Sequence, residues 1–173
     1  MQAKPTVKIC LSAMFLALGM VLPLFTAQIK EIGDTLLPMH LPVMLCGLLC
    51  GPLFGGTIGL ALPFLRSALF SMPPLYPNAV WMALELATYG LVIGMVYKKM
   101  QNKGILGVYI SLISAMVLGR IVWGIAKSVL LSAKGGFSFA MFITGGFVDA
   151  LLGIILQLII IPLIMSVLKT KKE

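Results

Sequence analysis

Six ionisable side chains interrupt the long apolar stretches of this 173-residue chain. They are, in chain order, His40, Arg66, Glu85, Arg120, Lys127 and Asp149. A charge within a long apolar segment is costly, so such groups usually serve a function. These residue types can bind a charged organic molecule through ion pairs and hydrogen bonds. Catalysis is the weaker interpretation, because the sequence has no serine, cysteine or aspartate arrangement typical of a nucleophilic site.

Three aligned residues indicate one wall of a binding site. Arg120, Trp123 and Lys127 follow the spacing i, i+3 and i+7, which places them on one face of a helix. An aromatic plane between two cations makes a suitable wall for an organic anion. We therefore expect these residues to face a substrate.

The charges within the apolar stretches do not balance. Three cations stand against two carboxylates, so one positive charge remains. A buried surplus cation needs an anionic partner, and a substrate carboxylate is one candidate. The other candidates are water and two loop residues, Glu31 and Asp34. A structural alternative pairs Arg120 with Asp149 and Arg66 with Glu85, in which case the charges only hold helices together.

His40 and Tyr76 are further candidate substrate contacts. His40 lies two residues before Pro42, at the expected outer rim of an apolar stretch. A histidine there is either a hydrogen-bonded structural residue or a contact to substrate. Tyr76 lies in the proline-rich turn 71–77. Because the chain has one histidine and no cysteine–acid cluster, we expect neither a metal site nor a cofactor.

The composition places these groups in a membrane protein. Hydrophobic residues make up 60% of the chain and charged residues 10%, against roughly 45–50% and roughly 25% in soluble domains. No soluble fold of this size can bury so much apolar surface. We expect an all-α integral membrane protein that forms a single domain over residues 1–173. Its six transmembrane helices are expected at 6–26, 37–50, 54–69, 79–97, 105–131 and 139–168.

The lysines predict the topology. Cytoplasmic loops carry an excess of lysine and arginine. With six spans, only Lys30 and Lys134 fall in external loops. Eight lysines fall in segments on the other side: Lys4, Lys8, Lys98, Lys99, Lys103, Lys169, Lys171 and Lys172. We therefore expect both termini in the cytoplasm, and we attribute the net charge of +8 to this bias instead of to nucleic-acid binding.

Several motifs resemble one family of membrane proteins. Ala13 and Ala17 are two small residues one turn apart in the first helix. Denser motifs follow: Met39-His-Leu-Pro-Val-Met-Leu-Cys-Gly47, Gly51-Pro52, Gly55 to Gly59 with Pro63, Arg66-Ser-Ala-Leu-Phe70, Met72-Pro-Pro74 and Met82-Ala-Leu-Glu-Leu-Ala-Thr-Tyr-Gly90. Together these resemble the substrate-binding S components of energy-coupling factor (ECF) transporters, the prokaryotic vitamin importers. The resemblance covers essentially the whole chain and is densest over 39–90.

The resemblance implies a function and partners. It implies a vitamin-binding pocket near the outer face of the prokaryotic cell membrane, capped by the loop after the first helix. It also implies docking on a membrane scaffold subunit that is driven by two cytoplasmic ATPases, with Ala13 and Ala17 as the scaffold contact. The chain itself has no Gly-Lys-Ser/Thr phosphate loop and is not expected to hydrolyse ATP. Pantothenate-type S components are resembled most, and relatives handle cobalamin, pyridoxine or pyrimidine precursors.

Two other classes of function remain open at this point. In a proton-coupled secondary carrier, Glu85 and Asp149 would be proton relays. Such carriers usually contain two inverted halves, and the sequence has no matching pair. A purely structural membrane subunit is the third class, and it would not need converging charges.

Overall fold

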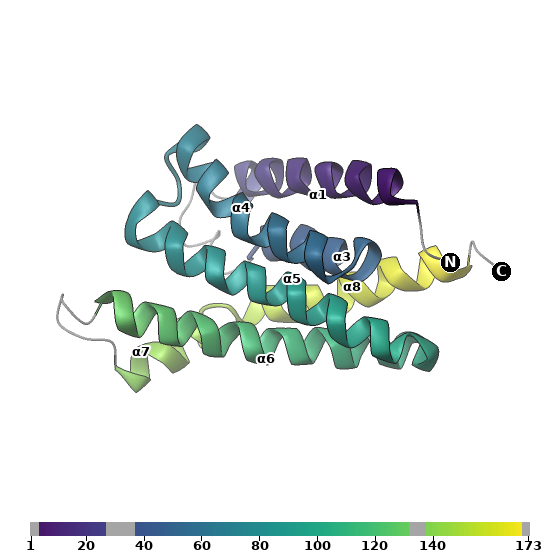
Figure 1. The fold of residues 1–173 in the computed structure, drawn as a ribbon. Coiled ribbons are helices and arrows are strands. Elements are labelled where there is room, and N and C mark those ends of the chain that lie inside the picture. The colour runs from purple at the N-terminus through teal and green to yellow at the C-terminus, as the bar shows by residue number, and fades with distance from the viewer. Residues whose placement is uncertain (1–3, 27–36, 132–137, 171–173) are drawn as a thin grey trace.

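The computed structural model describes residues 4–26, 37–131 and 138–170. These residues form helices packed side by side, and they contain no β-strand (Figure 1). In chain order the α-helices are α1 (Pro5–Thr26), α3 (His40–Cys50), α4 (Pro52–Phe70), α5 (Val80–Met100), α6 (Gly104–Leu131), α7 (Phe139–Ile143) and α8 (Leu151–Thr170). The predicted all-helical fold is confirmed for this part of the chain.

Four stretches are long and apolar enough to cross a membrane. They are Pro5–Leu24, Pro52–Phe70, Leu75–Leu131 and Ala140–Leu168. The third is 57 residues long and includes both α5 and α6, which the short 3₁₀ turn Gln101–Lys103 joins. In Figure 1, α5 and α6 run side by side in opposite directions.

Two expected helices differ from the structure. The stretch 37–50 becomes an α3 of only 11 residues, which is about 16 Å long at ~1.5 Å per residue and shorter than a bilayer core of about 30 Å. The expected helix 139–168 is interrupted by a π-helical turn at Thr144–Val148. A Cβ added at Gly145 would lie 3.3 Å from the Trp123 ring. The glycine therefore lets this interruption lie close against α6.

Helices α3, α4 and α5 touch through their backbones at three glycines, which we call the glycine contact: Gly47, Gly55 and Gly90. A Cβ added at Gly47 would lie 2.6 Å from the carbonyl oxygen of Gly90. One added at Gly55 would lie 2.6 Å from Gly47 Cα, and one at Gly90 would overlap the backbone of Gly55. Small residues allow such close approach between membrane helices. The glycine contact thus fixes three helices relative to one another.

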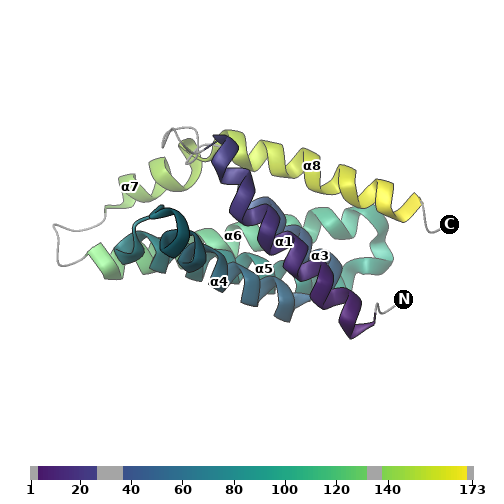
Figure 2. The same ribbon diagram turned by 90° about the horizontal axis from the view of Figure 1, so that it is seen from above.

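Helix α5 is the centre of the bundle, because it packs against α3, α4 and α6. Helix α1 packs on α3 and α4, while α8 packs on α6 and α3 (Figure 2). The outer surface carries large apolar side chains, such as Leu53, Leu69 and Val129, at 74%, 69% and 68% exposure. A surface of this kind suits contact with lipid, because a water-soluble monomer rarely exposes so many apolar side chains together.

The two ends of the bundle differ. Helix α1 begins and α8 ends at the same end, where the turn between α5 and α6 also lies (Figure 1). The opposite end holds the turn between α4 and α5, the end of α6 and helix α7 (Figure 1). The candidate site lies at this second end.

Candidate functional site

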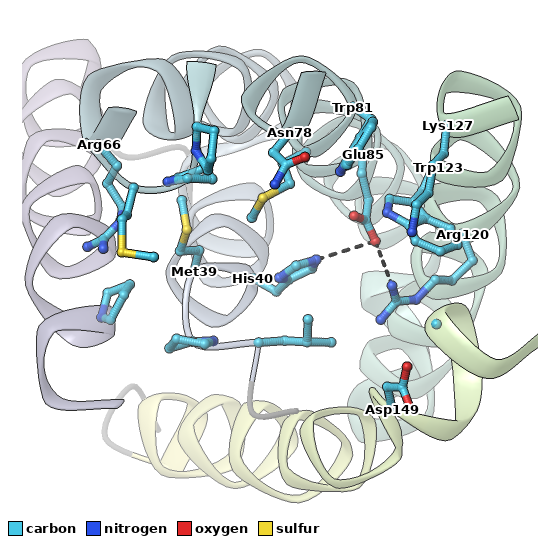
Figure 3. Close-up of a pocket in the computed structure, with 18 residues that line it drawn as sticks. Met39, His40, Arg66, Asn78, Trp81, Glu85, Arg120, Trp123, Lys127 and Asp149 are labelled. Carbon is cyan, nitrogen blue, oxygen red and sulfur yellow. Dashed lines mark ion pairs between the residues drawn. The ribbon is translucent and has the colours of Figure 1, made fainter. Parts of the chain in front are cut away.

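A cavity of about 430 Å³ opens between five parts of the chain. Its walls come from the end of α1, the start of α3, the segment from the end of α4 into α5, the second half of α6, and the interruption between α7 and α8. Seven of the eight substrate contacts expected from the sequence line it: His40, Arg66, Glu85, Arg120, Trp123, Lys127 and Asp149. Figure 3 shows how their side chains surround the space.

Glu85 on α5 connects two other helices within the wall. Its Oε1 atom lies 3.0 Å from Nη1 of Arg120 on α6 and 3.4 Å from Nε2 of His40 on α3 (Figure 3). The exposure of these three side chains is between 2% and 4%. A buried ion pair of this kind compensates charges that would otherwise be costly in an apolar surrounding.

This pairing corrects the structural alternative considered for the sequence. Glu85 forms its ion pair with Arg120 and not with Arg66. Asp149 forms no ion pair with Arg120 among the described residues, although the two lie on the same side of the cavity (Figure 3). The physical reason is the packing of α5 between α3 and α6, which turns Glu85 towards both.

Arg66 lies on the opposite side of the cavity from Arg120 (Figure 3). It is 4% exposed, and its Nη1 donates a hydrogen bond to the backbone carbonyl of Met20 on α1 at 2.7 Å. Its guanidinium also lies 5.3 Å from the centre of the Phe70 ring. Among the described residues, no carboxylate forms an ion pair with Arg66.

Two tryptophans form an aromatic wall around Lys127. The Nζ atom of Lys127 lies 4.5 Å from the centre of the Trp123 ring and 5.5 Å from that of Trp81. The guanidinium carbon of Arg120 lies 5.9 Å from the Trp123 ring. Cations near aromatic faces at such distances are attracted to them. The structure thus places Arg120, Trp123 and Lys127 on one wall, in the arrangement that their spacing predicts.

Three residues that line the cavity carry buried nitrogen atoms without a hydrogen-bond partner among the described residues. These atoms are Nδ1 of His40, Nε of Arg66, and Nε and Nη2 of Arg120. Buried polar atoms are almost always paired, and leaving one unpaired is costly. The arrangement is therefore suited to a ligand that supplies oxygen acceptors.

Tyr76 is the expected contact that does not line the cavity. It is 63% exposed and lies in the π-helical turn Leu75–Ala79. Asn78 and Trp81 line the wall instead. The sequence already indicated both residues by their spacing. Asn78 lies seven and Trp81 four residues before Glu85, which in a helix places them on the same face as Glu85.

Some expected features fall elsewhere. Ala13 and Ala17 are exposed on α1 and do not line the cavity. The loop expected to cap the pocket, with Glu31 and Asp34, lies outside the described residues, as do Lys30 and Lys134. Within the described residues, no group of three or more His, Cys, Asp or Glu side chains could hold a metal ion.

An apolar helical bundle with a polar cavity at one end is typical of membrane proteins that bind a small molecule. The sequence matches the family model of the ECF transporter, substrate-specific component, over residues 7–165. The chain therefore belongs to this family. No curated protein and no solved structure matches it significantly.

Family membership defines the general role. Substrate-specific components are transport subunits that bind small molecules and work with an ECF module, and they are not enzymes. Membership does not favour a stand-alone carrier. The protein is thus a membrane subunit for substrate binding in transport.

Proposed function

We propose that this protein is the high-affinity subunit that binds a water-soluble vitamin for uptake into a prokaryotic cell, with pantothenate as the favoured substrate. The observation that supports this most is the cavity, in which seven charged, polar or aromatic residues expected from the sequence come together. Its volume of about 430 Å³ lies in the usual range of roughly 300–1,000 Å³ for small-molecule sites. The surplus of positive charge favours a vitamin that carries a carboxylate.

The proposal includes the arrangement in the membrane. The chain forms one domain with six transmembrane helices and with both termini in the cytoplasm, so the cavity opens to the outside. The location of the first and last described residues at one end of the bundle supports an even number of crossings (Figure 1). A reporter fused after Glu173 or inserted at Asn102 should be cytoplasmic, and an external position for Asn102 would contradict this topology.

The proposal also includes the partners. The subunit docks on a membrane scaffold protein, and two cytoplasmic ATPases drive the transport cycle. The docking surface includes the outer face of α1, where Ala13 and Ala17 are exposed one helical turn apart. Side chains this small allow a partner helix to approach closely.

A thermal-shift screen of vitamins on the detergent-purified protein tests the proposal. A ligand that binds only the folded state stabilises it by RT ln(1 + [L]/Kd), about 2.7 kcal/mol at one hundred times Kd. Pantothenate should therefore raise the unfolding temperature, while cobalamin, pyridoxine and pyrimidines should not. If another vitamin alone raises it, the choice of substrate is wrong. If none does, the proposed function is wrong.

A further inference from the structure

The two arginines of the cavity carry their charges in different surroundings. Arg120 is paired with Glu85 at 3.0 Å, and both side chains are almost fully buried. The charges of the two groups cancel. Nε and Nη2 of Arg120 are buried and have no hydrogen-bond partner among the described residues, so this side chain keeps unused donor capacity beside the cavity. Arg120 is therefore suited to an uncharged carbonyl or hydroxyl oxygen.

Arg66 is a buried cation without a compensating carboxylate among the described residues. Its Nη1 donates to the neutral carbonyl of Met20, while its Nε has no partner within the described part of the chain. A carbonyl oxygen carries only a partial charge and leaves the full positive charge of the guanidinium unneutralised. A buried charge in this state is unfavourable until an anion pairs with it.

Asp149 makes the opposite side of the cavity unsuitable for an anion. It is exposed, and it lies beside Arg120 across the cavity from Arg66 (Figure 3). A carboxylate there repels a second carboxylate, but it accepts hydrogen bonds from hydroxyl groups. The two sides of the cavity thus differ in the chemistry that they favour.

We propose that Arg66 binds the carboxylate of the substrate and thereby sets its orientation. This inference rests on the proposed function, because it assumes that the cavity holds an acidic vitamin. The uncharged end of the substrate then extends towards Arg120 and Asp149, which supply a donor and an acceptor. Pantothenate has a matching distribution of groups, with a carboxylate at one end, hydroxyl groups at the other and an amide between them.

Lys127 is the competing cation for the carboxylate. Its Nζ atom lies near the rings of both Trp81 and Trp123. These contacts offset part of its charge, and it lies on the same side of the cavity as Arg120 (Figure 3). It must therefore be included in any test of Arg66.

The test compares pantothenate with its alcohol analogue, in which CH₂OH replaces the carboxylate. Isothermal titration of the full-length protein in detergent gives Kd for each compound. The wild-type protein should prefer the acid by about tenfold to one hundredfold, since a charge-assisted hydrogen bond contributes roughly that factor. In Arg66→Gln the affinity for the acid should fall until the two compounds bind about equally. Arg120→Gln should weaken both compounds together, and Lys127→Gln should keep the preference for the acid.

The matched control is Arg66→Lys, which keeps the charge but loses the planar guanidinium. It should retain part of the preference, and it carries the test if Arg66→Gln does not fold. An undiminished preference for the acid in Arg66→Gln, or in Arg66→Lys where Arg66→Gln does not fold, overturns the assignment, and so does a preference that disappears in Arg120→Gln or Lys127→Gln.

Failure of the proposed substrate has a different signature. In that case the wild-type protein binds neither pantothenate nor the alcohol. The role of Arg66 is then tested with the ligand that the vitamin screen identifies. A ligand without an anionic group overturns the role of Arg66, and an acidic one is compared with its amide in the same variants.

Discussion

The same three helices form the glycine contact and part of the cavity wall, in opposite ways. Each helix carries a glycine towards one end of the bundle and an ionisable residue towards the other. The pairs are Gly47 and His40 on α3, Gly55 and Arg66 on α4, and Gly90 and Glu85 on α5. In the glycine contact the backbones touch, whereas at the other end the same helices supply part of the wall around a cavity of about 430 Å³. Close packing in one region thus fixes the helices that position the ionisable groups around the cavity in the other.

The largest expected effect comes from breaking the glycine contact. Gly90→Leu should prevent stable folding, because the new side chain would overlap the backbone of Gly55 and no rotamer change can relieve a backbone overlap. Overpacking usually costs about 1–3 kcal/mol and more where nothing can move. Size-exclusion chromatography and thermal unfolding in detergent measure the result. Ala17→Leu, a similar enlargement at an exposed site, is the control and should fold normally.

The next effect comes from removing the carboxylate that connects the cavity helices. Glu85→Gln leaves Arg120 without its ion-pair partner, and breaking a buried pair costs about 3–5 kcal/mol. We expect a clear loss of thermal stability, with part of it recovered in the double variant Glu85→Gln with Arg120→Gln. Equal stability of wild type and Glu85→Gln would contradict a structural role for this pair.

A smaller effect is expected from Arg120 on binding. Arg120→Ala should weaken the affinity for the vitamin by more than about tenfold, or ~1.4 kcal/mol, because it removes two donors from the cavity wall. Arg120→Lys should recover only part of the loss. Titration is done on protein that remains folded. An unchanged Kd would mean that Arg120 serves only to hold Glu85.

The smallest effect on binding is expected far from the cavity. Replacing Ala13 and Ala17 with leucine should leave Kd unchanged, because both residues are exposed on α1 and neither lines the cavity. Uptake into cells that carry the complete transporter should nevertheless fall, because a bulky side chain keeps a partner helix away. Uptake that falls only in proportion to a weaker Kd would instead indicate a role in internal packing.

The sequence predicted the helices well, because apolar length and proline or glycine boundaries are local signals. It did not predict the interruption at Thr144–Val148, since the surrounding stretch is apolar throughout and only Gly145 and Gly146 mark the place. Six ionisable residues were recognised from their cost in an apolar segment. Their pairing was not, because it depends on which helices are neighbours, and Glu85 turns towards Arg120 only when α5 packs between α3 and α6.

The central claim is that the vitamin binds in this cavity, and the two tryptophans of the chain allow a direct test. Trp81 and Trp123 are the only tryptophans, and both line the cavity. Titration with pantothenate should therefore change the intrinsic tryptophan emission, and the change should be half complete at the Kd found by calorimetry. Trp81→Phe and Trp123→Phe should each retain part of the change. If pantothenate stabilises the protein while the emission stays constant, the vitamin binds elsewhere and the account is wrong.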